Sequence, residues 1–433
     1  MAAIMPCATE WPRPAHHRPS RQIKRSLYVV MKSLASRVSV MNGEGALSVF
    51  ARANELERSG RSIVHLELGE PGFHPPEPVR DAAKRAIDAG LDRYVTPQGI
   101  WELRQALVEY LARTRSVHTV PENVFVAPGC KIALALTMQA LIEPGDEVIY
   151  PDPGFPIYSS ITRSLGAVPV SYRMLAKGGA QPDPDEVAGL VTPRTKLLIL
   201  NTPNNPTGTV LKRDTLAALH ETAVRHDLWV ISDEIYSRLI YDSAYHSIFM
   251  FPGAPERTII LDGFSKTFAM SGWRLGYAVA PPNAIAALNM LTVNSFTCVA
   301  QFTQIAAIEA LRDITNAVAA MLTEYARRRE ILVAGLNRIP GLACHWPQGA
   351  FFAWVDVSGT GMTGDEFSER LLEEAGVAGI AGSSFGEHGR NFVRFSFAQE
   401  SEHLHAAVQR IERFVEAVTS LGTANSKRRS SRR

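Results

Sequence analysis

The segment GFSKTFAMSGWRLG, residues 263–276, lies between two apolar runs at 258–261 and 275–280. Both runs have the length and composition of short buried strands. Lys266 follows the first run closely, and Arg274 comes eight residues later. A serine followed by a lysine is by itself typical of an ordinary surface loop, so the significance of this segment depends on the sequence around it.

Short apolar runs alternate with helical patterns through the middle of the chain. We expect strands at residues 124–127, 147–150, 196–200, 228–232, 258–261 and 275–280, mostly with helices between them. This alternation predicts an α/β fold in which a mixed, mostly parallel sheet is sandwiched by helices. Ligands bind such sheets at the carboxyl ends of the strands, so the loops after these runs are the candidate site.

The flanking regions predict a second, smaller α+β unit. A helix is expected at 46–59 and a strand at 63–68, and a helical pattern over 301–339 either bridges two domains or breaks near Asp313. Strands at 351–355 and 392–397 and helices at 365–375 and 402–418 follow. The expected division is a disordered basic leader (1–30), an N-terminal segment of the small domain (31–74), the large domain (75–320), the C-terminal part of the small domain (321–421) and a disordered basic tail (422–433).

Two polar residues stand just after predicted buried strands. Asp233 follows the run at 228–232. A carboxylate there is ordinarily a helix cap or a loop hydrogen-bond acceptor, but it can also pair with the ring nitrogen of a cofactor. Asn205 lies in the turn-rich segment PNNPTG, residues 203–208, which in isolation is simply a loop.

Other candidates depend equally on their context. Cys130 and Lys131 begin an Ala/Leu-rich helix after a strand, where free backbone N–H groups can face an anion. Phe155, in the segment PGFPIY, is either a core residue or an aromatic platform for a ligand. Arg394 is a charge in the centre of an apolar strand, where a charged side chain is seldom left unpaired.

These segments together resemble the class I and II aminotransferases, which are fold-type I pyridoxal phosphate enzymes. The segment 263–276 is similar, position by position, to the lysine signature of that family, and the other motifs follow in the family's order over about residues 31–421. The resemblance implies the fold-type I architecture, pyridoxal 5'-phosphate as the cofactor, and transfer of an amino group from an L-amino acid to a 2-oxo acid.

The resemblance also implies roles for individual residues. A lysine amine can condense with an aldehyde and later shuttle a proton when burial or a nearby cation disfavours its charged form, and an arginine suits a phosphate. The implied catalytic residues are Lys266, Asp233 and Tyr236. The implied cofactor-binding residues are Cys130, Lys131, Phe155, Asn205, Asp233, Tyr236, Ser265, Lys266, Arg274 and Tyr94, and the implied substrate-binding residues are Gly69, Asn205, Arg394 and Lys131.

In that resemblance, Asp233 pairs with the pyridine nitrogen, Tyr236 and Asn205 bind the 3-hydroxyl, Phe155 stacks on the ring and Arg394 clamps the substrate α-carboxylate. Gly69 resembles part of a loop that closes over the substrate. Tyr94 resembles a tyrosine that reaches the phosphate of a neighbouring subunit, which implies a homodimer with shared active sites. Cis peptide bonds are implied before two prolines, at Asp152-Pro153 and Asn205-Pro206.

Some positions depart from the family's pattern, and the substrate is only weakly encoded. Gly263, Gly72 and Ala381 replace a serine, an aspartate and a proline that relatives use. Lys131 matches a lysine that binds the distal carboxylate in some bacterial aspartate and prephenate aminotransferases, whereas Glu44 stands where they carry a small hydroxyl. A carboxylate there would repel aspartate or neutralise Lys131, so both an aspartate-type and a broad specificity remain open.

Two other classes of protein share this resemblance. Lyases and synthases of the same fold keep the same site residues, so they remain an alternative to an aminotransferase. Transcriptional regulators carry a domain of the same kind behind a DNA-binding domain. Only about forty residues precede the body here, which is too short for a winged helix, so a regulator is the weakest alternative.

Charge and cysteine content bear on location and partners. The ends hold twelve of the 45 basic residues but one of the 43 acidic ones, so the body is acidic although the whole chain has a net charge of +2. Basic ends of this kind could bind nucleic acid or anionic lipid, but the proline-containing leader is expected to be disordered. It also resembles an Arg-rich transit peptide, or it could be upstream sequence before a true start at Met31. Four scattered cysteines without a CxxC spacing indicate neither a zinc site nor a disulfide framework. The sequence predicts a cytoplasmic enzyme that binds no metal, membrane or nucleic acid.

Overall fold

The computed structural model describes residues 32–41, 43, 45–174, 181–312 and 315–430. The chain separates into two units, Met1–Ser36 and Arg37–Arg433, and the fold is that of the second unit. The expected leader (1–30), Glu44 and Asp313 lie outside the described residues.

The helices are α1 (Ser36–Ser39), α2 (Gly45–Arg58), α3 (Glu77–Asp88), α4 (Trp101–Arg115), α5 (Cys130–Leu141), α6 (Ile157–Ser164), α7 (Pro184–Gly189), α8 (Arg213–Arg225), α9 (Pro282–Val293), α10 (Gln301–Arg312), α11 (Thr315–Asn337), α12 (Gly364–Arg370) and α13 (Ser401–Ser430).

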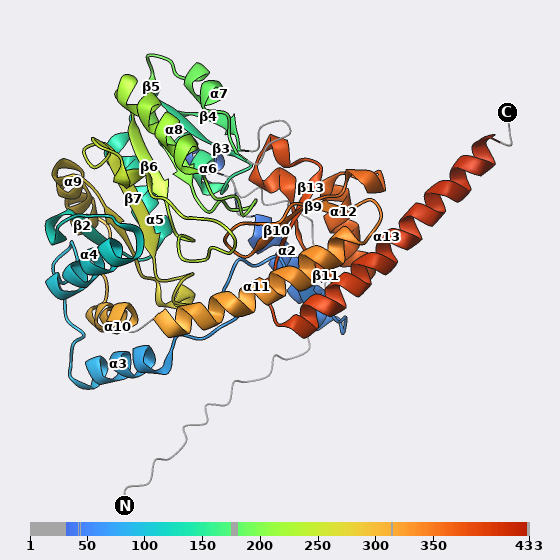
Figure 1. The fold of residues 1–433 in the computed structure, drawn as a ribbon, viewed down its shortest axis with the longest axis horizontal. Helices are drawn as coiled ribbons and strands as arrows, with labels where there is room; N and C mark the ends of the chain where they lie inside the picture. Colours follow the sequence, from blue (N-terminus) through green and yellow to red (C-terminus); the bar gives the residue numbers. More distant parts are fainter. Residues whose placement is uncertain (1–31, 42, 44, 175–180, 313–314, 431–433) are drawn as a thin grey trace, which may run out of the picture. The chain divides into compact units, whose positions relative to one another are not determined.

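A seven-stranded sheet forms the larger part of the fold (Figure 1). Its order is β2-β8-β7-β6-β5-β3-β4, and the four pairings from β7 to β4 are parallel, whereas β8 runs antiparallel to both of its neighbours. The predicted mixed, mostly parallel sheet is therefore confirmed. The strands are β2 (Val124–Ala127), β3 (Glu147–Asp152), β4 (Val168–Arg173), β5 (Thr195–Asn201), β6 (Trp229–Asp233), β7 (Thr258–Gly263) and β8 (Gly276–Val279).

Helices cover both faces of this sheet because its central strands are apolar on both sides. Alternate residues of β2 show the division: Val124 and Val126 pack with α4 and α10, whereas Phe125 and Ala127 pack with α5 and α9. All of these side chains are fully buried. Strands buried on both faces are typical of parallel sheets, and this burial holds the strand ends in fixed positions.

A smaller sheet of four strands is built from the C-terminal part of the described chain. Its order is β12-β13-β10-β9, all antiparallel, and a separate parallel pair joins β1 to β11, with Val64 opposite Val377. The predicted packing of the N-terminal segment against the C-terminal unit is confirmed by this pair. Helices α11 and α13 lie side by side beside this sheet (Figure 1). The strands are β1 (Val64–His65), β9 (Ala343–Cys344), β10 (Phe352–Asp356), β11 (Val377–Ala378), β12 (Ile380–Ala381) and β13 (Phe392–Ser396).

Three elements differ from the expectations. Strand β1 is shorter than the predicted 63–68 because the chain turns away from β11, and the Leu66 carbonyl accepts a hydrogen bond from Ser396 N instead. The edge strand β4 is absent from the prediction, since its Val168 is half exposed and polar residues alternate along it. Helix α13 continues to Ser430, past the predicted end at 418 and into the predicted tail. No proline interrupts it, and basic residues suit a helix C-terminus.

In the described part of the chain, the helical pattern at 301–339 is represented by α10, which ends at Arg312, and α11, which begins at Thr315. Asp313, where a break was one of the two expectations, lies outside the described residues. None of the helices in the described part of the chain is both long and apolar enough to cross a membrane.

Candidate active site

Loops from both sheets surround one cavity of about 450 Å³. Asp233 is the last residue of β6, Lys266 follows β7, and Cys130 is the first residue of α5. Arg394 reaches the cavity from the middle of β13 in the small sheet. Of the predicted site residues, the cavity is lined by Gly69, Cys130, Lys131, Phe155, Asn205, Asp233, Tyr236, Ser265, Lys266, Arg274 and Arg394.

Tyr94 is the predicted site residue that the structure leaves outside this cavity. Its side chain is 86% exposed. A residue that serves the site of a neighbouring subunit has this placement in a single chain. The two predicted cis peptide bonds, at Asp152-Pro153 and Asn205-Pro206, are both present, and the Thr202-Pro203 bond is also cis.

Asp233 is a buried carboxylate that accepts few hydrogen bonds. Its Oδ2 accepts a hydrogen bond of 2.6 Å from the Tyr158 hydroxyl, and its Oδ1 accepts one of 3.3 Å from Ile235 N. Burial is the main reason why the pKa of Asp233 lies at about 6, above its ordinary value of 3.8. The two hydrogen bonds oppose this rise, and the neighbouring carboxylates of Asp262 and Glu234 add to it. The group is therefore mostly ionised at neutral pH, but it would be strongly stabilised by a cation.

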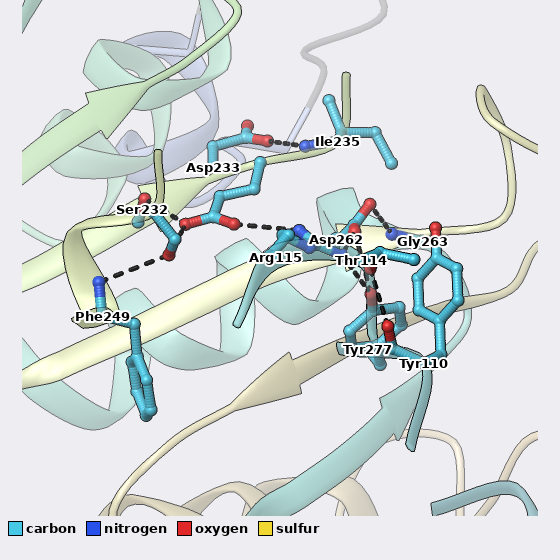
Figure 2. A network of polar contacts seen from close by, with 12 residues as sticks. Tyr110, Thr114, Arg115, Ser232, Asp233, Ile235, Phe249, Asp262, Gly263 and Tyr277 are labelled. Carbon is cyan, nitrogen blue, oxygen red and sulfur yellow. Dashed lines mark hydrogen bonds and ion pairs between the residues drawn. The ribbon is translucent and has the colours of Figure 1, made fainter. Parts of the chain in front are cut away.

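A buried charge network lies directly behind Asp233 (Figure 2). The guanidinium of Arg115 donates to Glu234 Oε2 at 2.9 Å and to Asp262 Oδ2 at 2.5 Å, and Tyr277 donates to Asp262 at 2.8 Å. In Figure 2 the carboxylate of Asp233 points toward Ile235 and away from this cation. Arg115 thus balances the two carboxylates on either side, while Asp233 remains available to the cavity.

Sequence reasoning did not find this network or the Tyr158 contact. Glu234 and Asp262 could have been noticed as acidic residues at the ends of apolar strands, but Arg115 lies at the end of α4, more than a hundred residues away from both. Only the fold brings it to them.

Asn205 and Arg394 line the same cavity and are joined by a hydrogen bond. Arg394 Nη1 donates to Asn205 Oδ1 at 2.8 Å, and its Nη2 donates to the Glu67 carbonyl at 2.6 Å. The rings of Phe352 and Phe385 lie 4.3 and 4.9 Å from the guanidinium carbon. An arginine held in this way offers a fixed, planar cation to a carboxylate.

Lys266 lines the cavity together with Asp233 and Arg394. Its Nζ donates a hydrogen bond to the Gly69 carbonyl and lies 5.9 Å from the centre of the Phe351 ring. The amine of Lys266 therefore points into the cavity from the seven-stranded sheet, which also carries Asp233. It contacts the loop after β1, which contains Gly69.

The first turn of α5 and Arg274 form a cationic corner. The N-terminal backbone N–H groups of a helix have no partners within the helix and attract anions. A Cβ atom on Gly129, whose φ is +92°, would lie 2.4 Å from Arg274 Nη2, and one on Gly276 would lie 2.4 Å from Cys130 N. Only glycines allow this approach, which places the guanidinium beside the start of the helix.

One prediction follows from the burial of Asp233 alone. In ligand-free protein, Asp233→Asn should stabilise the fold at pH 8 by up to about 3 kcal/mol, because the folded state there holds an ionised carboxylate whose pKa is raised to about 6. Well below pH 3.8, the ordinary pKa of the group, the carboxyl is protonated in both folded and unfolded states, so the gain should disappear. Urea unfolding at both pH values measures this difference.

Asp88→Asn is the matched control, because Asp88 is exposed at the end of α3. It should show no pH-dependent gain. Equal stability of Asp233→Asn and the wild type at pH 8 would contradict the buried, poorly compensated carboxylate.

Comparison with known proteins agrees with this geometry. The family described as aminotransferase class I and II matches residues 61–411. An aspartate aminotransferase of Pyrococcus horikoshii is 39% identical over 88% of this chain and 97% of its own length. A probable aspartate/prephenate aminotransferase of Thermus aquaticus is 42% identical over 90% of this chain and all of its own.

The solved structures give the same result for the fold. The aspartate aminotransferase from Thermus thermophilus with maleate has a TM-score of 0.85 and 40% identity, covering 88% of this chain and all of that one. Sequence, fold and the converging lysine, aspartate and arginine therefore agree that this chain belongs to the class I and II aminotransferases and is a fold-type I enzyme that transfers an amino group from an amino acid to a 2-oxo acid.

Proposed function

We propose that the cavity binds pyridoxal 5'-phosphate as the cofactor of this amino transfer. The observation that carries the proposal is the convergence of Lys266, Asp233 and the cationic corner on one cavity, together with Arg394. The donor set fits the group: the α5 N-terminus, Ser265 and Arg274 suit a phosphate, and the buried carboxylate of Asp233 suits a protonated ring nitrogen. When bound, this cofactor supplies an aldehyde to hold the amino group and an electron-withdrawing ring.

The residues of the chain bind and orient the cofactor and the substrate, and they move protons. Phe155 lines the cavity at its Lys131 side and is placed to cover the ring face, and Tyr236 and Asn205 provide polar groups for the 3-hydroxyl. Arg394 binds the α-carboxylate of the amino acid in the orientation set by Asn205 and the Glu67 carbonyl. The Lys266 amine would take the proton from the substrate Cα, and the ammonium so formed would donate it to the aldehyde-derived carbon of the bound cofactor, which regenerates the amine.

For the substrate we propose an aspartate-type amino donor. Lys131 lines the cavity, and its Nζ lies 5.6 Å from the centre of the Phe155 ring, so a cation stands near the cavity in addition to Arg394. Maleate, present in the Thermus thermophilus structure, is a four-carbon dicarboxylate, as aspartate is. Lys131 and Arg394 both line the cavity, and two cations in one cavity suit a substrate with two carboxylates.

The test compares two amino donors in single half-reactions, followed by the absorbance of the cofactor. Lys131→Ala should lower kcat/KM for aspartate roughly 10- to 100-fold, the loss expected for one charge-assisted hydrogen bond. The backbone N–H of residue 131 is kept, so phosphate binding should remain. Alanine is the matched donor because it lacks a distal carboxylate, and its rate should not change. An equal loss for both donors would refute the contact between Lys131 and the substrate.

We further propose a homodimer in which Tyr94 reaches the phosphate site of the partner subunit. Its 86% exposure in one chain supports this placement, and two-fold symmetric dimers are the commonest homo-oligomers. Tyr94→Phe should release the cofactor roughly tenfold faster on dilution, since one hydrogen bond to a charged group is lost, while sizing should still show a dimer. A wild-type enzyme that is active as a monomer would contradict the shared site.

We also propose a cytoplasmic location. The cysteines that the structure describes, Cys130, Cys298 and Cys344, are free thiols. Unpaired cysteines are usual in a reducing compartment.

A further inference from the structure

Tyr158 is a fully buried tyrosine whose hydroxyl lies at the carboxylate of Asp233. It stands in the first turn of α6, which follows the loop that carries Phe155. Its hydroxyl donates to Asp233 Oδ2 at 2.6 Å. Burial and the charge of Asp233 raise the pKa of Tyr158 well above its ordinary value. The phenol therefore keeps its proton, and a donor of this kind favours the ionised carboxylate over the neutral acid.

The other groups around Asp233 make this donor important. Burial, Asp262 and Glu234 all favour the neutral acid. Arg115 pairs with those two carboxylates and not with Asp233. From α5, the Cys130 thiol lies 4.0 Å from Asp233 Oδ1, and its pKa is raised by burial, so it adds no charge.

Four cationic residues, Lys131, Lys266, Arg274 and Arg394, line the same cavity as Asp233. In the described part of the chain, the carboxylate of Asp233 accepts hydrogen bonds from the Tyr158 hydroxyl and the Ile235 backbone N–H and has a distant contact with the Cys130 thiol. The hydroxyl is the shortest of these contacts, and it comes from a different element from the one that carries Asp233.

Tyr158 also contacts the residue placed to cover the ring. The rings of Phe155 and Tyr158 are edge-to-face, with centroids 5.8 Å apart and planes at 83°. The Tyr158 side chain therefore contacts both Asp233, the proposed partner of the cofactor's ring nitrogen, and Phe155, the proposed cover of the cofactor's ring face.

We propose that Tyr158 is a positioning residue: its hydroxyl holds the Asp233 carboxylate ionised and oriented toward the ring nitrogen of the cofactor. This inference rests on the proposed function, because it concerns how Asp233 meets pyridoxal phosphate. Tyr158 does not touch the reacting atoms, and it acts through Asp233.

The experiment uses Tyr158→Phe in the holoenzyme, which removes one oxygen and keeps the ring. The dissociation constant of pyridoxal 5'-phosphate should rise roughly 10- to 100-fold at pH 7.5, the effect of losing a hydrogen bond to a charged group. The acid limb of the kcat profile should move up by about one pH unit, because Asp233 becomes easier to protonate. No shift in either measurement would overturn the proposal.

Tyr172→Phe is the matched control. Tyr172 is equally buried, and its hydroxyl donates at 3.3 Å to the Ile199 carbonyl rather than to Asp233. It should leave cofactor affinity and the pH profile unchanged. A loss of affinity as large as that of Tyr158→Phe would show that removing any buried phenol here is sufficient, which would contradict the specific role.

A double-mutant cycle separates positioning from packing. In an Asp233→Asn background there is no carboxylate to keep ionised, so adding Tyr158→Phe should change cofactor affinity less than twofold. If Tyr158→Phe still lowered cofactor affinity by about 10- to 100-fold in that background, the role of Tyr158 would be merely structural. Failure of the wild type to retain cofactor at Lys266 would instead refute the proposed function itself.

Discussion

Lys266→Ala should abolish amino transfer, with turnover falling by about 10⁴-fold or more. The expected loss is at the upper end of what one acid–base group contributes, because the same amine also holds the cofactor. Its Nζ lies in the cavity with Asp233 and Arg394, and it contacts the Gly69 carbonyl. Steady-state rates with aspartate and a 2-oxo acid, using protein checked for folding, measure the loss.

Lys196→Ala is the control, because Lys196 is exposed on β5 and does not line the cavity. Its turnover should equal that of the wild type. Substantial turnover by Lys266→Ala would mean that another group moves the proton, and the assignment of Lys266 would be wrong.

Arg115→Met should destabilise the fold by about 3–5 kcal/mol, the loss typical of removing one partner from a buried ion pair. The side chains of Arg115 and Glu234 are fully buried, and Asp262 is nearly so. Without the guanidinium, two carboxylates would be left close together without a cation to balance them. Urea or thermal unfolding of the variant measures the change in the free energy of unfolding.

Arg312→Met is the matched control on the surface. Arg312 is 71% exposed and lies 3.5 Å from Glu309, one turn away on α10. Exposed pairs of this kind contribute about 0–1 kcal/mol. If Arg115→Met cost no more than this control, the buried network would not be a structural centre of the fold.

The candidate site could be found from the sequence because its residues follow strands. Asp233, Asn205 and Lys266 each come just after an apolar run, and parallel strands bring their carboxyl ends to one edge. The register confirms this for two of the strands, since Asn201 pairs with Asp233 across β5 and β6. The strand pattern therefore located these residues, and the resemblance to the aminotransferase family gave them their expected roles.

Contacts between distant segments could not be predicted in the same way. The hydroxyl of Tyr158 reaches Asp233 across 75 positions of the sequence, and Arg115 reaches Asp262 across 147. Neither tyrosine nor arginine has a local pattern that states its partner. Such pairs depend on how helices pack over the sheet, which periodicity alone does not specify.

The sequence pattern also did not predict the elements at the edge of the fold. Strand β4 pairs with β3 on one side and is partly exposed, so it lacks the continuous apolar run of β5 to β7. Tyr94 shows a related limit: its resemblance implies a neighbouring subunit, and a single chain simply exposes it.

The most direct test of the central claim is to find where the cofactor is attached. The holoenzyme is reduced with borohydride, digested, and mapped by peptide mass spectrometry. We predict that the pyridoxyl group is recovered on the peptide that contains Lys266, and that the Lys266→Ala protein yields no labelled peptide from this region. Labelling at another lysine, or trapping that survives in Lys266→Ala, would contradict the account.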